Sequence, residues 1–490
     1  MNIFENYRLL DGTRDEGFAA EGSCQPGLDH VLGLFSELTP DDLMRRQRLA
    51  ESAFLEAGIT FSVYSDERGT EKIFPFDLIP RLVAAEDWKA IERGLEQRVE
   101  ALDLFLDDIY GDQRFVTSSG IAKDVLDAVV FSSSGYLEQL RGVRPPTATR
   151  VHISGIDLVR SPDGRFLVLE DNARVPSGVS YVLENRQTMK RVFPRLFAES
   201  RVRSVDDYPL RLRQTLLDAS PVSPDESHVV VLTPGPFNSA YFEHSFLARR
   251  MGCPLVQGSD LFVKDKTVYV RTTRGPERVD VIYRRIDDDF LDPDFFRSDS
   301  VLGVKGLMEA FVAGNVSLAN APGNGVADDK GTYALIPELI RFYLSEEPLL
   351  GQVETYLCAR PDDLRYVLDH LAELVVKPVG ASGGYGMLIG PQATRDQLAE
   401  FARLLRDDPK NYIAQPLVSL SACPCWIEGA AEPRRVDLRP FVLRGQSTWV
   451  LPGGLTRVAL ERGSYVVNSS QGGGSKDTWV LRASENGDAP

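Results

Sequence analysis

The 490-residue sequence predicts an α/β (α+β) fold built from more than one structural unit. Three patterns support this prediction. Residues 88–110 carry apolar side chains at helical spacing, residues 155–172 have the pattern of two strands joined by a turn, and residues 228–258 have the pattern of a strand, a helix and a second strand. Because a chain of this length exceeds the size at which one core keeps growing, we expect two or three units.

The composition is that of an ordinary globular protein, with 43% apolar and 26% charged residues. No apolar run reaches the roughly 18 residues of a membrane span, and the first residues lack the basic and then apolar order of a signal peptide. We therefore expect a cytoplasmic protein with no membrane partner. The net charge of −16 repels nucleic-acid phosphates, so no nucleic-acid partner is expected, and it mildly favours cationic small molecules.

The cysteines are sparse and odd in number, which argues against a disulfide framework. Cys423 and Cys425 are close in sequence, but no second cysteine pair or nearby histidine completes a zinc site. All five are expected to be structural thiols: Cys24, Cys253, Cys358, Cys423 and Cys425.

A turn at residues 161–164 joins the two strands of the expected hairpin. Its sequence is Ser-Pro-Asp-Gly, in which Pro presets one backbone angle and Gly tolerates a positive φ. If Arg160 pairs with Arg165 across this turn, Asp157 lies opposite Val168.

This register predicts that Asp157, Glu170 and Asn172 share one face of the hairpin. The two carboxylates would then lie diagonally, roughly 7 Å apart or somewhat less. Carboxylates this close repel one another unless a cation lies between them, and carboxylate and amide oxygens are the ligands that Mg²⁺ prefers. The alternative is a half-exposed hairpin with acidic residues on its wet face, and the hairpin alone does not decide between the two.

Residues 228–258 predict a small α/β layer with a parallel sheet. The loop at 233–239 lies at the carboxyl end of a strand, where such sheets bind ligands. Another apolar strand ends at Arg284 and Arg285. One of these arginines could clamp a substrate carboxylate, or it could form a salt bridge with the acidic residues at 287–289, and both readings stay open.

Two polar segments have alternative interpretations. Glu243 and His244 begin a helix and could contact an amine substrate, although a charge placed near the helix dipole explains them more simply. Residues 469–477 are rich in Ser and Gly and precede a strand-like pattern. We interpret them as a loop that covers a ligand rather than as a linker.

Lys377 lies at the end of an apolar strand and precedes a glycine-rich loop and a second strand. Glycines at 380, 383, 384 and 386 would let backbone N–H groups approach an anion closely, and the lysine adds a positive charge. The loop has neither the Walker sequence nor the spacing of a dinucleotide fingerprint. A loop that closes over nucleotide phosphates fits this pattern, and a flexible hairpin turn is the alternative.

Two later strands carry further polar candidates. Residues 412–416 form a short apolar strand that breaks at Pro, typical of a hinge whose backbone can bind an adenine edge near Gln415. Residues 434–443 alternate polar and apolar, which places Asp437 and Arg439 on one face. An arginine in such a position can hold a transferring phosphoryl group.

Together these residues resemble the ATP-grasp superfamily, in particular the circularly permuted ATP-grasp type 2 proteins, which are similar to glutathionylspermidine synthase. In the usual ATP-grasp order the lysine and the glycine loop precede the Asp, Glu and Asn metal set. Here Asp157, Glu170 and Asn172 come before Lys377. The strings at 320–330 and 467–479 look like family signatures, and the likeness extends from roughly residue 70 to 482.

The resemblance implies a circularly permuted ATP-grasp fold with a small parallel α/β pre-ATP-grasp-like layer and a helical N-terminal region. It also implies ATP and Mg²⁺ as cofactors, and ligation of a carboxylate to an amine through an acyl phosphate with release of ADP and phosphate. The glutathionylspermidine synthases carry an arginine two residues before the first metal aspartate, where this chain has Gly155. The implied metal ligands are Asp157, Glu170 and Asn172, the implied nucleotide contacts are Lys330, Lys377, Gly383, Gly384, Gly386 and Gln415, and the catalytic candidates are Arg439 and Lys377, to which we add Arg284 and Arg285.

Two other functions stay open, namely a non-catalytic nucleotide-binding partner protein and a phosphotransferase that does not ligate. The substrates would be a small-molecule or peptide carboxylate and an amine, and the sequence specifies neither of them nor the oligomeric state. The expected organisation is a mostly helical region (1–115), a metal-binding part (116–205), an α/β layer with substrate and phosphate loops (225–345), a glycine-lid and adenine-hinge part (350–482) and a flexible tail (483–490).

Overall fold

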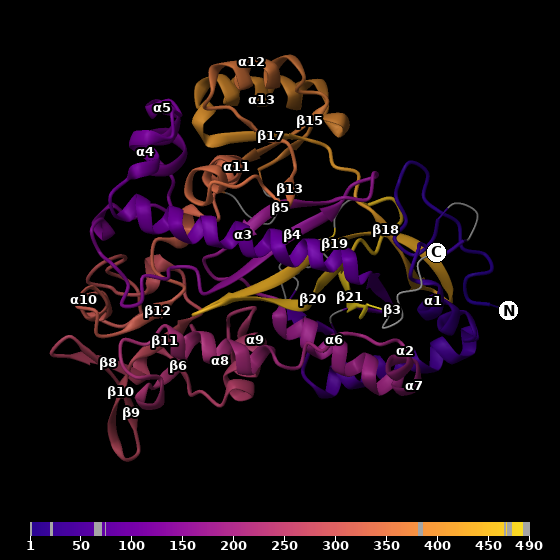
Figure 1. The fold of residues 1–490 in the computed structure, drawn as a ribbon, viewed down its shortest axis with the longest axis horizontal. Coiled ribbons are helices and arrows are strands. Elements are labelled where there is room, and N and C mark those ends of the chain that lie inside the picture. The colour runs from indigo at the N-terminus through magenta and orange to yellow at the C-terminus, as the bar shows by residue number, and fades with distance from the viewer. Residues whose placement is uncertain are drawn as a thin grey trace.

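The computed structural model describes residues 2–19, 23–62, 71–73, 75–380, 386–464, 467 and 473–483. A sheet of eight strands lies at the centre, with a parallel sheet of four strands on one side and a second four-stranded sheet on the other (Figure 1). Parts of the sequence predictions fall outside the described residues, namely Gly383, Gly384, residues 469–472 of the predicted covering loop and the tail from residue 484.

The central sheet joins segments that are far apart in the sequence. The β4–β5 hairpin pairs with β19, nearly 300 residues later, and β3 from the N-terminal region closes the other edge next to β21. The β3 strand was not anticipated within the mostly helical region. In spatial order the strands are β13 (Gly351–Gln352), β5 (Phe166–Asn172), β4 (Ile153–Arg160), β19 (Ala430–Arg444), β20 (Thr448–Val458), β21 (Gly474–Val480) and β3 (Phe76–Val83), and β18 (Ala422–Ile427) also pairs with β19.

Helices cover both faces of this sheet. The α3 helix (Ala85–Tyr110) crosses one face, and α6 (Val179–Val192) packs on β20 and β21 (Figure 1). The apolar stripe predicted on α3 is buried from Trp88 to Tyr110, so its interpretation as core packing is confirmed. The N-terminal helices α1 (Asp29–Ser36) and α2 (Pro40–Glu56) lie beside α6 and α7 (Pro194–Glu199).

The α/β layer has the parallel sheet that the sequence predicts. Strand β6 pairs in parallel with β11 and β7, and β11 pairs in parallel with β12. The α8 and α9 helices pack together beside it. The elements of this layer are α8 (Tyr208–Asp218), β6 (Val229–Leu232), α9 (Tyr241–Met251), β7 (Leu255–Val256), β8 (Leu261–Lys264), β9 (Thr267–Thr272), β10 (Gly275–Val279), β11 (Val281–Arg284), α10 (Leu307–Val312) and β12 (Ser317–Ala319).

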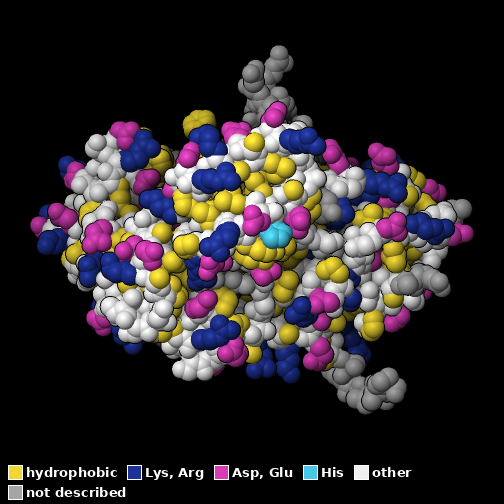
Figure 2. Space-filling view, turned by 90° about the horizontal axis from the view of Figure 1, so that it is seen from above, with side chains coloured by type: hydrophobic (Ala, Val, Ile, Leu, Met, Phe, Trp, Pro, Cys, Tyr) yellow, Lys and Arg dark blue, Asp and Glu magenta, His cyan; other side chains and the backbone are white. Residues whose placement is uncertain are grey.

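The second four-stranded sheet forms a lid domain with its own apolar core. Its outer face, seen from above in Figure 2, carries charged side chains of both signs with small apolar groups between them. No single sign of charge dominates the described part of this face, which gives a charged ligand no preferred place on it. The lid comprises β14 (Tyr356–Leu357), α12 (Pro361–Asp369), β15 (Leu374–Pro378), β16 (Leu388–Ile389), α13 (Arg395–Asp407) and β17 (Tyr412–Pro416).

One further helix connects the α/β layer to the lid, and the other elements not yet described are short. This helix, α11, begins at Lys330 and packs against α3. The remaining elements are α4 (Arg114–Ser118), α5 (Lys123–Leu126), α11 (Lys330–Leu344), β1 (Thr60–Ser62) and β2 (Glu71–Ile73).

The loop predicted at residues 469–477 is wrong for its last four residues, which belong to strand β21. Lys476 and Asp477 are fully buried there. Lys476 pairs with Asp77 at 2.6 Å, and Asp477 pairs with Arg186 at 2.8 Å. These long-range ion pairs let a polar sequence form a central strand, because each buried charge meets an opposite one.

The thiols and the helices agree with a simple globular chain. All five cysteines lie in the described part of the chain as free thiols, and Cys423 and Cys425 are both buried. Burial raises the pKa of each of these two thiols, as expected of structural rather than reactive cysteines. Over the described ranges, no helix is both long and apolar enough to cross a membrane.

Candidate active site

The β4–β5 hairpin places Asp157 directly opposite Glu170. The predicted register was wrong, because the turn spans residues 161–165 and β5 has a bulge next to Glu170. Val168 therefore lies opposite Leu158 instead of Asp157. Directly opposed residues have side-chain origins roughly 5 Å apart, so the two carboxylates start closer together than predicted.

Asp157 is buried beneath two arginines of the neighbouring strands. It is 2% exposed, and Arg439 on β19 binds it with two nitrogens, Nε at 2.5 Å and Nη2 at 2.8 Å. Arg457 on β20 donates a further hydrogen bond of 2.8 Å. Burial alone would raise the pKa of Asp157, but Arg439 and Arg457 outweigh it and hold this pKa below its ordinary value.

Arg457 joins Asp157 to a second buried carboxylate, Asp437. Its Nε lies 2.9 Å from Asp437 Oδ1, and both residues are at most 9% exposed. Two aspartates and two arginines thus neutralise one another in a group that we call the arginine cluster. The alternating pattern of β19 predicted that Asp437 and Arg439 share one face, but Arg457 was not predicted. The cluster consists of Asp157, Asp437, Arg439 and Arg457.

Glu170 meets Lys330, which the loop at 320–330 brings from the α/β layer. The Lys330 Nζ lies 3.2 Å from Glu170 Oε1. Lys330 is the first residue of α11, which Asp329 caps by accepting from the Gly331 amide. Asn320, at the start of the loop, donates to the carbonyls of Ile153 and Ala173 and so fixes the loop to both ends of the hairpin.

Lys377 approaches the same carboxylate from the lid. Its Nζ donates to Gln415 Oε1 at 2.7 Å, and Gln415 in turn donates to Thr355. Burial lowers the pKa of Lys377 to about 8, while Glu170 opposes this shift and Lys330 adds to it. Glu170, Lys330, Lys377 and Gln415, which we call the lysine cluster, therefore carry two lysines and one carboxylate, and a polyanion would stabilise their charge.

Asn172 completes the predicted metal set on the same face as Asp157. It lies opposite Gly155, and its Nδ2 is buried without a hydrogen-bond partner among the described residues. Within the described part of the chain, no three or more His, Cys, Asp or Glu side chains are grouped so that they could hold a metal by themselves. A cation here would rest on two carboxylates, one amide and oxygens of a bound phosphate, which is the usual pattern for Mg²⁺.

Asp157 still has room for such a ligand. Over the described residues it accepts two hydrogen bonds at Oδ2 and one at Oδ1. A carboxylate offers about four lone-pair positions, so one position at Oδ1 is left. By this count Asp157 can accept one further ligand while Arg439 and Arg457 stay bound, and the donor types present fit Mg²⁺.

Arg284 and Arg285 are both buried in contacts with the protein itself. Arg284 donates to the Asn320 and Ala321 carbonyls and pairs with Asp288 at 2.9 Å, which agrees with the salt-bridge alternative. Arg285 donates to the Pro176 carbonyl and pairs with Glu243 at 3.0 Å. Their positions favour roles in holding loops rather than in direct contact with substrate.

Glu243 and His244 are also committed to internal contacts. One oxygen of Glu243 accepts from the amides of Gly178 and Ser180 at the start of α6. His244 Nδ1 lies 2.9 Å from the Thr233 hydroxyl, and burial lowers the pKa of His244 to about 2. An amine substrate at these two residues has no support in this geometry.

An acidic pocket of about 190 Å³ adjoins the lysine cluster. It lies between the loop that ends at Lys330 and the start of the glycine loop at Gly380. Arg174 lies 3.7 Å from Asp287 and 3.8 Å from Asp328. The other charged residues described around the pocket are aspartates, so negative charge exceeds positive charge there. Burial raises the pKa of Asp328 to about 7. The charged residues that line the pocket are Arg174, Asp287, Asp288, Asp289, Asp328 and Asp329.

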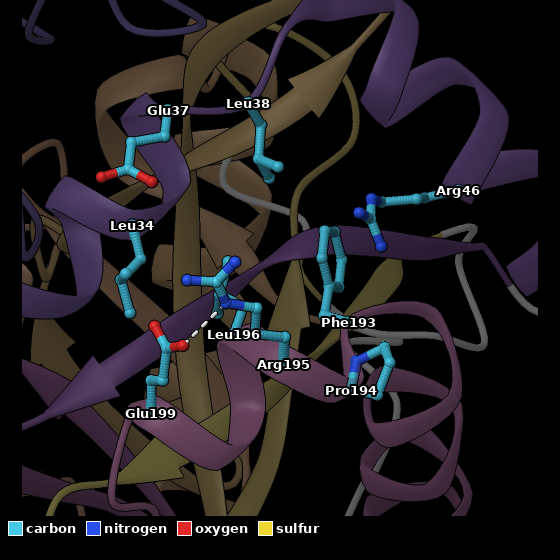
Figure 3. Close-up of a pocket in the computed structure, with 9 residues that line it drawn as sticks. All are labelled: Leu34, Glu37, Leu38, Arg46, Phe193, Pro194, Arg195, Leu196 and Glu199. Carbon is cyan, nitrogen blue, oxygen red and sulfur yellow. Dashed lines mark hydrogen bonds and ion pairs between the residues drawn. The ribbon is translucent and has the colours of Figure 1, made fainter.

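A larger pocket of about 320 Å³ lies elsewhere, between the N-terminal helices and the junction of α6 and α7 (Figure 3). Its floor is apolar, and Arg195 and Glu199 on its rim pair with one another at 2.8 Å. Arg46 donates to the Val192 carbonyl. Arg195, Glu199 and Arg46 are engaged in these contacts, and none of the predicted site residues that the structure describes lines the pocket.

The structure thus brings most of the predicted site residues together from four separate stretches of chain. The hairpin, the loop before α11, the lid strands and β19 converge on Glu170 and Asp157. Gly386, at the end of the glycine loop, is exposed and has a positive φ of 69°. The roles of these residues toward a ligand stay predictions at this point.

Comparison with known proteins gives consistent matches. A family model described as "Circularly permuted ATP-grasp type 2" matches residues 80–459. An uncharacterized protein of Synechocystis is 54% identical over 96% of this chain and 97% of its own length. A protein of Frankia alni named "Putative glutamate–cysteine ligase" is 43% identical over 96% of this chain, but the chain spans only 54% of that relative. The solved structure of a glutathione synthetase-like effector from Globodera pallida shares the fold, with a TM-score of 0.60 at 12% identity over 91% of this chain and 98% of the other.

Proposed function

The chain belongs to the circularly permuted ATP-grasp type 2 family, and from this premise we propose that it is an ATP-dependent ligase that joins a carboxylate to an amine. The mixed α/β fold and the permuted order of its parts are those predicted from the sequence. The observation that supports the proposal most strongly is the convergence of Lys330 and Lys377 on Glu170 beside the buried Asp157. This arrangement offers positive charge for phosphates and oxygen ligands for a cation in one place.

In this proposal the lysine cluster holds the nucleotide. Lys330 and Lys377 would bind phosphate oxygens, and a phosphate near Lys377 would restore the pKa that burial lowers. Glu170, Asn172 and Asp157 would hold Mg²⁺, which offsets the charge of the phosphate oxygens when bound. Gln415 positions Lys377 through the hydrogen bond of 2.7 Å.

The chemistry would proceed in two balanced steps. A carboxylate oxygen of the acid attacks the γ-phosphorus, the bond to the β-phosphate oxygen breaks, and ADP leaves. The amine nitrogen then attacks the acyl carbon, phosphate leaves, and the amine loses a proton to give the amide. Arg439 would face the negative charge that develops in the first step, because its side chain is 16% exposed at the edge of the arginine cluster.

The acidic pocket supports an amine as the second substrate. Asp287 and Asp289 lie on its wall beside Asp328, and they are next to the cluster that would hold the γ-phosphate. A protonated amine would be attracted to such a wall, and the net charge of the chain has the same sign. The Frankia relative is about twice as long as the matched part, so the substrates in its name belong to that longer protein.

The test is a reaction with MgATP, a pool of N-acetylated amino acids and peptides as acids, and a pool of polyamines and amino acid amides as amines. We expect ADP and phosphate to form only when an acid and an amine are both present, with a new amide detected by mass spectrometry. Formation of AMP and pyrophosphate would contradict the proposal. ADP formed without any amine would indicate a phosphotransferase, and binding of MgATP without turnover would indicate a nucleotide-binding partner protein.

A further inference from the structure

Arg439 lies in a slot that exists because residue 155 has no side chain. A Cβ atom built on Gly155 would lie 3.2 Å from Cδ and 3.4 Å from Cγ of Arg439, and 3.3 Å from Cβ of Pro176. The stem of the arginine therefore runs between strand β4 and the proline. Distances of this size are tighter than ordinary van der Waals contact, so a methyl group at residue 155 would force the arginine stem or Pro176 to shift by a few tenths of an ångström.

The backbone does not explain why glycine stands at this position. Gly155 lies inside a buried β-strand and is not among the glycines with positive φ. A glycine in a strand interior costs roughly 0.5–1 kcal/mol relative to alanine. Space for the Arg439 stem is the feature of this site that only glycine provides.

The slot aims the guanidinium in one direction. Nε and Nη2 bind Asp157, whereas among the described residues Nη1 has only a long contact of 3.4 Å to the Ser177 carbonyl. Nη1 is thus the nitrogen that can donate to a bound group. On the other side, Arg457 fixes Asp157 through a hydrogen bond of 2.8 Å, so the carboxylate that Arg439 grips is itself held in place.

We propose that Gly155 and Arg457 are positioning residues for Arg439: Gly155 opens the slot, and Arg457 fixes Asp157, so that Arg439 Nη1 meets the phosphoryl group as it transfers. This inference rests on the proposed function for the identity of the group that Arg439 meets. Neither Gly155 nor Arg457 would touch the substrate. Each would act on the rate through the orientation of Arg439.

The probe is MgADP with aluminium fluoride, which mimics a transferring phosphoryl group, compared by calorimetry with MgADP alone. We expect the wild-type protein to bind the aluminium fluoride complex at least about tenfold more tightly than MgADP, because it resembles the transition state. Gly155→Ala should reduce this gain about tenfold and leave the affinity for MgADP within about twofold, since it displaces only Arg439. Arg439→Ala should abolish the gain.

Gly351→Ala is the matched control. Gly351 lies on β13 of the same sheet, and of the described atoms a Cβ there would meet only Leu167 Cδ2, at 3.0 Å. This variant tests the effect of a crowded methyl group without Arg439, and both affinities should stay within about twofold of wild type. Arg457→Lys tests the other contact without adding an atom at residue 155, and it should lower the gain in the same direction as Gly155→Ala.

A crystal structure of unliganded Gly155→Ala gives a readout that needs no nucleotide. We expect the Arg439 Nη2 to Asp157 Oδ2 distance to increase from 2.8 Å beyond hydrogen-bond range. A Gly155→Ala protein that folds normally and keeps the wild-type gain, or a wild-type protein that shows no gain, would overturn the inference. Amide formation that is as fast in Gly155→Ala as in Gly351→Ala would refute the inference alone, whereas a clear aluminium fluoride gain without any amide product would refute the proposed ligation alone.

Discussion

The arginine cluster and the lysine cluster lie on the same hairpin but have opposite electrostatic designs. In the arginine cluster two aspartates and two arginines cancel within hydrogen-bond distance, and Asp157 is 2% exposed. In the lysine cluster two lysines share one carboxylate, and burial lowers the pKa of Lys377 to about 8. The four charges of the first balance one another, whereas the second carries two ammonium groups beside one carboxylate, so a bound anion would lower its positive charge.

This difference predicts that the arginine cluster mainly controls the stability of the fold and that the lysine cluster mainly controls nucleotide binding. Removing one partner from a buried, neutral group leaves an uncompensated charge, which is strongly destabilising. Removing a group that is held at an unfavourable charge costs little stability and can even relieve strain. The following experiments test this division between stability and binding.

The largest expected effect is on the arginine cluster. Arg457→Met removes the side chain that links Asp157 and Asp437, so we expect the free energy of unfolding to fall by about 3–5 kcal/mol. Urea denaturation followed by circular dichroism measures this value. Adding Asp437→Asn to the same variant should recover a large part of the loss, and a full loss in the double variant would show that the charges do not act as one cluster.

The next experiment compares two adjacent residues of β5 that face opposite sides of the sheet. Asp171 pairs with Arg98 of α3 at 2.6 Å, so Asp171→Asn should cost about 3 kcal/mol of stability and leave the affinity for MgATP nearly unchanged. Glu170→Gln should do the reverse, with affinity about tenfold weaker and stability within about 1 kcal/mol. Calorimetry and urea denaturation of the two variants give the comparison, and equal effects of both on affinity would contradict the assignment of Glu170.

Part of this division could be predicted from the sequence, since both strands of the hairpin, Lys377 at a strand end and Gln415 on a short strand follow from local patterns. The register could not, because a bulge next to Glu170 has no signal in the residues themselves. Arg457 was missed for a different reason. An arginine within a strand has no special sequence pattern. Its role in the cluster becomes visible only from its position opposite Asp437 in the β19–β20 pair.

The first four residues of strand β21 were missed because its partners are distant. Its Lys476 and Asp477 look like loop residues until Asp77 and Arg186, roughly 400 and 290 residues earlier, are placed beside them. Local composition favours a turn for Gly, Ser, Lys and Asp. Long-range ion pairing in the central sheet overrides it, and no single-sequence pattern contains that pairing.

The dependence of stability on pH tests the lysine cluster directly. The pKa of Lys377 is lowered to about 8 in the folded protein and is ordinary in the unfolded one, so the unfolded chain holds up to one more proton between pH 8 and about 10.5. Stability contributed by this residue is therefore lowest below pH 8 and rises between pH 8 and about 10.5, by at most about 3 kcal/mol. The measurement is the difference between wild type and Lys377→Met across this range.

The same shift predicts that MgATP binding takes up a proton near pH 8 to 9, because phosphate stabilises the charged form of Lys377. Calorimetry in buffers of different ionisation enthalpy detects this uptake, and Lys377→Met should lack it. A difference in stability that is flat from pH 7 to 10.5 would show that Lys377 is not held at an unfavourable charge.

The smallest effect concerns the residue that positions this lysine. Gln415 is 2% exposed and accepts from Lys377 at 2.7 Å, so Gln415→Glu would place a carboxylate beside the lysine in the same geometry. We expect the pKa of Lys377 to rise and the pH dependence between 8 and 10.5 to shrink, since the lysine then has an opposite charge without any ligand. MgATP affinity should fall about threefold, because phosphate must now compete with the introduced carboxylate for the same ammonium group. Thr355→Val is the control, because it removes the outer hydrogen bond to Gln415, together with the bond from Thr355 to the Val353 carbonyl, and adds no charge. If Gln415→Glu and Thr355→Val weakened MgATP binding equally, the position of the Lys377 ammonium group, rather than a competing carboxylate, would decide how Lys377 meets the nucleotide. The lysine cluster would then need no anion to balance its charge, as the arginine cluster needs none.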